Sequence, residues 1–216
     1  MKSGQPLQYL GWLVSRASGI VALVLISVSV VFGLAMAAKA LRRPSLKRAV
    51  MRLHEHLALT ALAAIAVHGL ALLGDQWLKP GWRGITIPFA LPYRPGFTGA
   101  GIIAGYLTLL LGPSFYLRRR IGARRWRAFH RGTVIVRVLS ALHALGAGSD
   151  SKTLWLRIVV LSPIPAIAYL LVLRIASSKP AASTAVRGAG PHANRPQRTF
   201  DTTSRRLRSE TADAGP

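Results

Sequence analysis

The sequence predicts an all-α protein, a polytopic membrane helix bundle of about five spans with a disordered C-terminal tail. Three observations lead to this fold class. Of the 216 residues, 51% are hydrophobic, the apolar residues gather into long runs almost free of charge, and basic residues cluster between the runs. A helix needs about 20 apolar residues to cross the hydrocarbon core of a bilayer. Ordinary soluble domains do not contain a series of such runs.

The apolar runs define the expected elements of a transmembrane domain over residues 17–176. The first run is longer than the apolar region of a signal peptide and a basic cluster follows it, which favours a retained helix. Residues 1–16 are expected to form an irregular or interfacial N-terminal lead-in. The five expected spans are residues 18–38, 53–74, 97–117, 128–147 and 154–175.

Prolines predict breaks in two of these spans. Pro113 lies near the end of the third span and is expected to kink it. Pro163 and Pro165 interrupt the fifth span, where a Pro-x-Pro sequence indicates a kink or a break that lines a cavity.

The composition changes after the fifth span. Ser, Thr, Ala, Gly, Pro and Arg dominate residues 177–216, which contain no sustained apolar run. We expect this segment to be a disordered, basic cytoplasmic tail that can lie on anionic lipid. It is too short and too polar to be a flavin or nicotinamide domain, so no flavin domain is expected in this chain.

The charge distribution predicts the topology. The chain has 29 Lys and Arg against six Asp and Glu, a formal net charge of +23, and much of the excess lies in residues 39–52 and 118–127. Basic loops stay in the cytoplasm, which places the N-terminus outside, the C-terminus inside, and the second and fourth spans running outward in parallel. Because the basic residues sit at the ends of membrane-length segments, they do not indicate a nucleic-acid partner.

Four histidines lie in the two parallel spans. His54 and His68 are fourteen positions apart in the second span, a distance of about 21 Å along a helix and within roughly 40° of the same face. His130 and His143 occupy matching depths in the fourth span. Histidines inside a membrane are costly and are therefore functional candidates. We expect an inner pair, His54 with His130, and an outer pair, His68 with His143.

Two opposing imidazoles suit a six-coordinate haem iron that transfers electrons. The chain has no cysteine, which rules out thiolate-ligated clusters and covalent CxxCH haem attachment. The thirteen-residue spacing from His130 to His143 leaves these rings roughly 140° apart on an ideal helix. Tilt, a π-bulge or over-rotation must absorb this difference. The competing interpretation of each histidine is a packed residue that donates to a carbonyl.

The histidine pairs, spaced by 14 and 13 residues, resemble those of the ferric reductase-like transmembrane family. That family includes NADPH oxidases, metalloreductases and the bacterial haem subunits of the methionine sulfoxide reductase system. RRWRAFHRGTVIVRVLSALH, residues 124–143, resembles the family's Trp-Arg-x-x-His helix, and HGLALLGD, PYRP and GAGSD resemble pieces of bacterial members. The similarity covers residues 17–175.

This resemblance implies two b-type haems with four axial iron ligands and no covalent attachment. Some bacterial members replace the first ligand of the second span, so the outer haem is the more firmly implied. Arg94, in the PYRP stretch, is expected either to bind outer-haem propionates through its guanidinium fork or to be an exposed loop arginine. The implied iron ligands are His54, His68, His130 and His143.

Several assignments remain open from the sequence. His56 is an alternative to His54 as the inner ligand, although only His54 has the fourteen-residue spacing, and His54-Glu55-His56 is not the HExxH pattern of a metalloprotease. Arg137, midway along the fourth span, faces a haem edge or propionate, a polar cavity, or the carbonyls of another helix. The inner propionates are expected to be neutralised by Arg52, Arg127 and Arg131, unless these arginines only keep their loops in the cytoplasm. The acidic residues Asp75 and Asp150 are expected to cap outer loops.

The expected function is that of a transmembrane b-type cytochrome in a bacterial inner membrane. It would act as an oxidoreductase electron-transfer subunit, taking electrons from a separate cytosolic flavin reductase or a membrane quinol. The acceptor would be ferric iron, oxygen or a periplasmic reductase protein. Alternatives are a histidine-containing membrane transporter or proton channel, and a non-haem scaffold protein. Apart from these proteins, the expected partner is membrane lipid.

Overall fold

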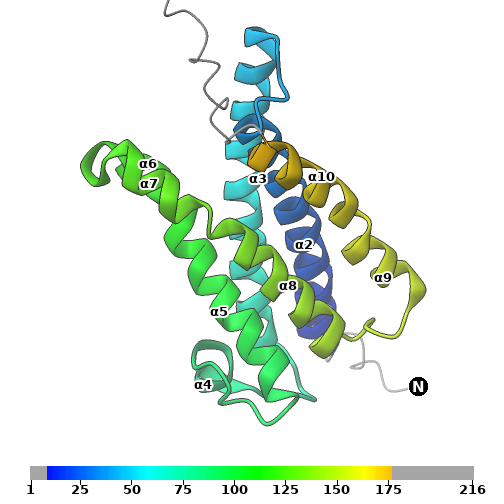
Figure 1. Cartoon of the computed structure of the whole chain (residues 1–216). Coiled ribbons are helices and arrows are strands. Elements are labelled where there is room, and N and C mark those ends of the chain that lie inside the picture. Colours follow the sequence, from blue (N-terminus) through cyan, green and yellow to red (C-terminus); the bar gives the residue numbers. More distant parts are fainter. Residues whose placement is uncertain (1–8, 177–216) are drawn as a thin grey trace, which may run out of the picture. The chain divides into compact units, whose positions relative to one another are not determined.

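The computed structural model describes residues 9–176, which form α-helices joined by short loops and one 3-10 turn, with no strand among them (Figure 1). This confirms the predicted all-α class. The expected tail, residues 177–216, lies outside the described residues, as do residues 1–8.

The first two helices form an antiparallel pair that is longer than the predicted spans. α2 covers Leu10–Ala37, so part of the expected irregular lead-in is helical. α3 covers Pro44–Ala71 and continues into the 3-10 turn η1, Leu72–Gly74. Pro44 at the first position of α3 is preset for a helix start. Most of the expected basic loop before residue 53 is therefore helical, because basic residues beyond the apolar run do not interrupt hydrogen bonding along a helix.

The next segment crosses back and then bends. The short helix α4, Gly81–Thr86, precedes α5, Pro95–Leu111. α6, Ser114–Ile121, follows after a bend of 54°. The bend lies at Gly112 and Pro113, as the position of the proline predicts, since proline removes a backbone donor.

The expected fourth span is divided into two helices. α7 covers Ala123–His130 and α8 covers Thr133–Ala147. Gly122, with φ of +89°, forms the tip between α6 and α7, a conformation that glycine adopts without steric cost. Arg131 and Gly132 form the break between α7 and α8, so His130 and His143 belong to different helices.

The last span is also divided at its prolines. α9, Leu154–Leu161, and α10, Pro163–Ala176, meet at Ser162. Together they run as a single candidate span of 23 residues, Leu154–Ala176.

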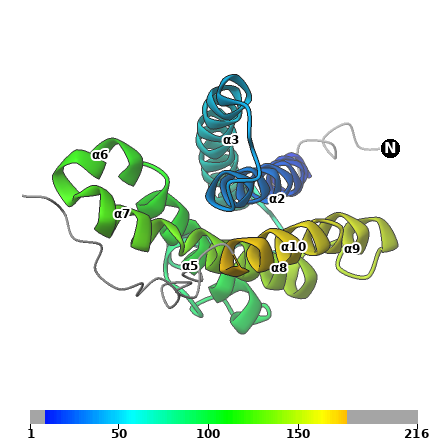
Figure 2. The same ribbon diagram turned by 45° about the horizontal axis from the view of Figure 1, so that its top comes forward.

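α2 is the central helix of this unit. It packs along α3 on one side and against α8 and α10 on the other. α5, α8 and the α9–α10 segment form a second layer beneath the α2–α3 pair (Figure 2). The main cluster of buried apolar side chains joins the layers and contains Ile26, Val30, Leu34, Ala61, Ala104, Leu111, Val136 and Leu170.

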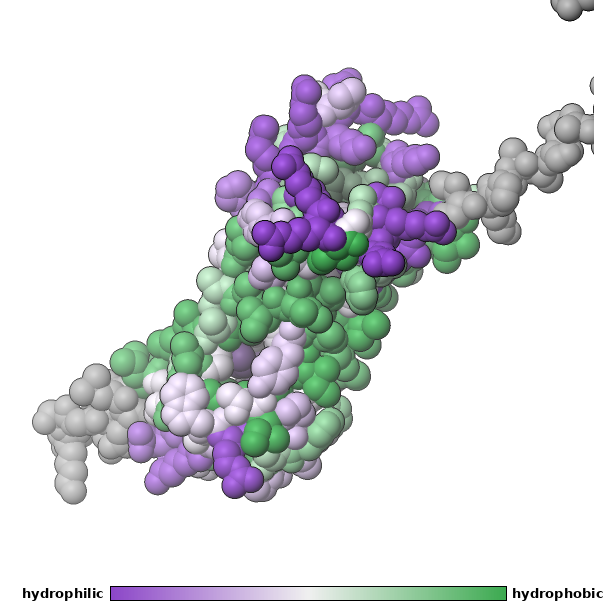
Figure 3. All heavy atoms as spheres, turned by 90° about the vertical axis from the view of Figure 1, so that its left-hand side faces the viewer, coloured by the Kyte–Doolittle hydropathy of each residue, from purple (hydrophilic) through white to green (hydrophobic). Residues whose placement is uncertain are grey.

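The described residues contain three helices long and apolar enough to cross a membrane, or four if the bent α5–α6 pair is one span. The expected fourth span is not among these helices, because it is divided into α7 and α8, which are 8 and 15 residues long. A hydrophobic band separates hydrophilic side chains gathered toward opposite ends of the helices (Figure 3). We call the end with the α2–α3 connection and the α6–α7 hairpin the basic end. The opposite end, with η1, α4 and the α8–α9 connection, is the long-loop end.

Candidate functional site

Four histidine side chains meet as two pairs between α3 and the α7–α8 segment. At the basic end, the ring centroids of His54 and His130 lie 6.1 Å apart with the planes at 83°. Toward the long-loop end, the centroids of His68 and His143 lie 6.0 Å apart at 78°. The structure thus brings together both pairs expected from the sequence. Within residues 9–176, no group of three or more His, Asp or Glu side chains forms a metal site.

The separation of the rings in both pairs fits two imidazoles on opposite sides of one metal ion. An imidazole nitrogen binds a metal at about 2.0 Å. Two opposed ligating nitrogens are therefore about 4 Å apart, and their ring centroids roughly 6 Å apart. Both observed distances agree with this expectation.

The outer pair is held through the Nδ1 atoms of both rings. Nδ1 of His68 lies 2.7 Å from the Ser15 carbonyl oxygen, and Nδ1 of His143 lies 2.9 Å from that of Phe97. A carbonyl oxygen can only accept, so each Nδ1 is the protonated nitrogen. Nε2 is then the nitrogen with the lone pair, which is the arrangement that orients metal-ligating histidines.

The inner pair is held on one side only. Nδ1 of His54 lies 2.9 Å from the Ser29 carbonyl oxygen. Nδ1 of His130 is buried and has no hydrogen-bond partner among residues 9–176. Instead, the indole of Trp126 stacks on the His130 ring, with centroids 4.9 Å apart and planes at 23°.

A cavity of about 380 Å³ lies beside the inner pair. Its wall includes both His54 and His130, and most of the remaining lining is apolar, contributed largely by α2 and α3. Three arginines also line it: Arg127, Arg131 and Arg174. An apolar cavity with two imidazoles and a basic rim suits a flat, mostly apolar cofactor that carries acidic groups. Arg52, the third expected inner arginine, is exposed and does not line the cavity.

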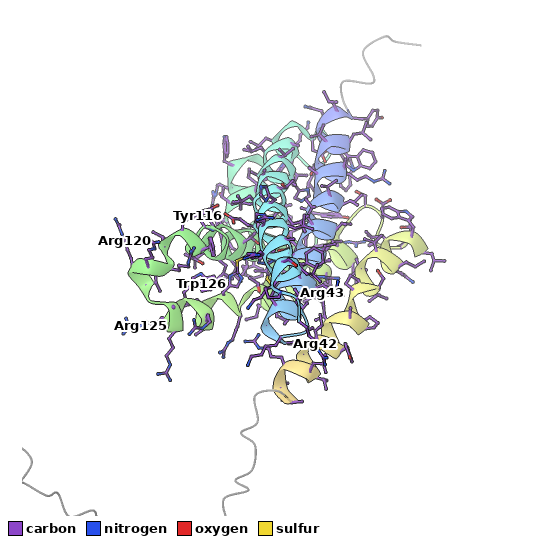
Figure 4. All side chains as sticks on the ribbon, turned by 90° about the horizontal axis from the view of Figure 1, so that it is seen from above. Arg42, Arg43, Tyr116, Arg120, Arg125 and Trp126 are labelled. Atoms are coloured by element: carbon purple, nitrogen blue, oxygen red, sulfur yellow. The ribbon has the colours of Figure 1, made fainter. Side chains whose placement is uncertain are left out.

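The α6–α7 hairpin covers the basic end of this cavity. Tyr116 and Trp126 lie on its α3 side, whereas Arg120 and Arg125 lie at its far tip (Figure 4). The Tyr116 hydroxyl donates to Glu55 Oε1 at 2.8 Å, which links α6 to α3 one residue from His54. The Trp126 indole N–H donates to the Ser114 hydroxyl at 3.2 Å. These bonds fix the side of the hairpin that faces the inner histidines.

His56 does not join either pair. Its side chain is exposed, and its Nδ1 donates to the carbonyl of Arg52 in the preceding turn at 2.7 Å. The geometry therefore favours His54 over His56 as the inner residue of α3.

Arg94 connects two helices beside the outer pair. It has φ of +43°, precedes α5, and donates from Nη1 to the carbonyl of Gly146 in the last turn of α8. This carbonyl is three residues beyond His143. A guanidinium has five N–H donors, so the bond to Gly146 is compatible with a second, anionic partner.

Arg137 reaches the carbonyl of another helix, one of its three expected environments. Its side chain is 4% exposed, and Nη2 donates to the Val160 carbonyl near the end of α9. Pro163 and Pro165 lack the N–H groups that would otherwise bond to the carbonyls of Val159 and Leu161, on either side of Val160. Arg137 therefore joins α8 to the broken span.

The two acidic residues of the long-loop end both have partners. The Asp75 carboxylate accepts the backbone N–H groups of Trp77 and Leu78 at 2.8 and 3.1 Å, as a capping residue does. Asp150 accepts a bidentate ion pair from Arg16, at 2.6 and 2.7 Å. This pair fixes the first turns of α2, where Ser15 lies, to the α8–α9 connection.

The helix bundle has a histidine pair toward each end, and its match to a family of transmembrane electron-transfer components gives the class of molecule. The family model described as "Ferric reductase like transmembrane component" matches residues 18–141. The chain belongs to this family. Comparison of the chain itself with curated proteins and with solved structures gave no significant match.

Several residues of the site do not stand out in the sequence. Ser15 and Ser29 act through backbone carbonyls, which every residue possesses, and Trp126 acts by stacking. One signal does mark the carbonyls. Ser15, Ser29 and Phe97 are each followed four residues later by a glycine.

Proposed function

We propose that this chain is a b-type cytochrome that carries electrons across a bacterial inner membrane through two bis-histidine haems. The observation that carries the proposal is the double pairing, His54 with His130 and His68 with His143, at ring separations suited to a single metal between each pair. A haem at each pair would supply a one-electron iron couple. Axial ligation would come from the four histidines.

The protein's own residues would determine where the two haems lie and how well they are shielded from water. The pairs are fourteen positions apart along α3, about 21 Å, which covers most of the roughly 30 Å hydrocarbon core. The basic end carries Arg127, Arg131 and Arg174 on the cavity wall. We propose that Arg127 and Arg131 neutralise acidic groups of an inner haem, and that Arg94 does so for an outer haem.

The charge pattern supports a direction of electron transfer from the basic end to the long-loop end. Basic loops favour the cytoplasm, so the inner pair would face the electron donor and the outer pair the acceptor. We propose a separate cytosolic flavin reductase or a membrane quinol as donor. Ferric iron, oxygen or a periplasmic reductase is the proposed acceptor.

Electron transfer across vesicles tests this function. The purified chain is reconstituted into liposomes containing ferricyanide, and dithionite is added outside with a membrane-impermeant dye as leak control. We expect internal ferricyanide to be reduced with the wild-type chain and not with His54→Ala or His143→Ala. Equal rates for wild type, variants and empty liposomes would contradict the proposal. Proton flux without electron flux would instead support a channel or transporter.

A further inference from the structure

The long-loop half of α2 contains a site that receives the His68 ring. Nδ1 of His68 bonds to the Ser15 carbonyl at 2.7 Å and also lies 3.0 Å from the Ser15 hydroxyl. Ser15 is buried, at 3% exposure. Gly19, one turn later, lies against the same ring, since a Cβ atom there would be 2.8 Å from Nδ1.

The basic half of α2 repeats this arrangement fourteen positions later. Nδ1 of His54 bonds to the Ser29 carbonyl at 2.9 Å and lies 3.0 Å from the Ser29 hydroxyl. A Cβ atom on Gly33 would be 3.4 Å from Cε1 of His54, an ordinary van der Waals contact, so this second site leaves more room around the ring than the first. The repeat on α2 therefore has the same spacing as the two histidines of α3.

α5 provides a third such site for His143. Nδ1 of His143 bonds to the Phe97 carbonyl at 2.9 Å, and a Cβ atom on Gly101 would overlap that Nδ1. The residue that supplies the carbonyl differs, but the glycine again follows four positions later. The shared pattern is a helix carbonyl at position i with glycine at position i+4.

Helix geometry explains this spacing. The carbonyl of residue i points along the axis toward the N–H of residue i+4. A side chain at i+4 would stand beside that carbonyl and obstruct a ring approaching from another helix. Glycine leaves the approach open, although it destabilises a helix relative to alanine.

His130 lacks this type of site. The position of α5 that lies fourteen residues after Phe97 is Leu111, where the helix ends. The Leu111 carbonyl accepts the Ser114 hydroxyl at 2.6 Å, and Nδ1 of His130 has no partner among the described residues. Trp126 packs against the ring in its place.

We propose that the carbonyl–glycine pairs Ser15/Gly19, Ser29/Gly33 and Phe97/Gly101 are ligand-positioning sites, each of which fixes the tautomer and the plane of one histidine. Trp126 takes over the positioning of His130. Their role toward haem rests on the function proposed above. Their contact with the histidines does not depend on that function, which allows the two ideas to be tested separately.

A double-mutant cycle between Gly19 and His68 tests the positioning site directly. The full chain is purified in detergent as wild type, Gly19→Ala, His68→Ala and the double variant. Thermal unfolding midpoints and outer-haem absorbance are measured. Gly69→Ala is the matched control, because a Cβ at Gly69 meets nothing within 4 Å.

We expect Gly19→Ala to lower the unfolding midpoint in the wild-type background and not in the His68→Ala background, since the added methyl group clashes with the ring. Gly69→Ala should lower it in neither. If Gly19→Ala does not accumulate as folded protein, accumulation of the double variant at the His68→Ala level supports the site. The same loss of stability in both backgrounds overturns it, as does no loss in either.

The spectroscopic measurement distinguishes positioning from general stability. Residues that orient a metal ligand change metal affinity by about 10–100-fold, so Gly19→Ala and Gly101→Ala should weaken retention of the outer haem by that order. Trp126→Leu should instead shift the inner-haem reduction potential, with Trp126→Phe closer to wild type. Equal effects of Gly19→Ala on both haems would overturn the positioning role. If even the wild type contains no haem, the proposed function fails while the thermal cycle still decides on the sites.

Discussion

The ring of His68 on α3 meets the ring of His143 on α8 with centroids 6.0 Å apart, and each ring bonds through Nδ1 to a carbonyl of a third or fourth helix. Four helices, α2, α3, α5 and α8, therefore converge on this single pair. With both Nδ1 atoms committed to carbonyls, both rings are left with Nε2 as the available ligating nitrogen.

Removing either histidine of the outer pair should abolish one haem site. We expect His68→Ala and His143→Ala to lower the haem content from about two to about one per chain, because a six-coordinate iron needs both axial imidazoles. Haem and protein are quantified together after gel filtration. Unchanged haem content in both variants would refute the ligand assignment.

The role of the inner pair can be tested against a matched control, because His56 lies two residues from His54 on the same helix. His54 faces His130, whereas His56 is exposed and bonds to its own helix. We therefore expect His54→Ala to remove the inner-haem signal and His56→Ala to leave it intact, measured as the low-spin electron paramagnetic resonance spectrum. The reverse result would show that His56 is the ligand.

Replacing Arg137 should destabilise the fold. Arg137→Met leaves the buried Val160 carbonyl without the guanidinium donor, at a cost of about 1–3 kcal/mol in the free energy of unfolding. The measurement is chemical unfolding in mixed micelles, with the exposed Arg157→Met as control. Normal stability combined with loss of haem would place Arg137 at the cofactor instead.

The Arg16–Asp150 pair should couple α2 to the α8–α9 connection. Lysine cannot reproduce the bidentate geometry, so Arg16→Lys should weaken the pair. A double-mutant cycle with Asp150→Asn should give a coupling of about 1 kcal/mol, reduced at high salt because Arg16 is partly exposed. Additive effects of the two substitutions would show that the ion pair does not link these segments.

The sequence was sufficient to predict the fold class and the pairing of histidines. Apolar length identified the helices, and basic clusters made the second and fourth spans parallel, which placed His54 with His130 and His68 with His143. The prolines also indicated where bends occur. The helix positions, the topology and the bends depend on the types of side chain present, which can be read from the sequence.

The thirteen-residue spacing of His130 and His143 shows what the sequence did not reveal. The sequence predicts that tilt, a π-bulge or over-rotation brings both rings onto one face, whereas the structure has a helix break at Arg131 and Gly132. The carbonyl partners on α2 and α5 were also missed, because backbone acceptors leave no residue signature. The early starts of α2 and α3 were missed because the apolar run marks the membrane crossing rather than the end of the helix.

A reduced-minus-oxidised difference spectrum of the purified full chain, normalised to protein concentration, tests whether the two histidine pairs bind haem. We expect a b-type α-band with about two non-covalently bound haems per chain, both low-spin, as two bis-histidine sites require. A colourless protein, after expression with an adequate haem supply, would contradict it.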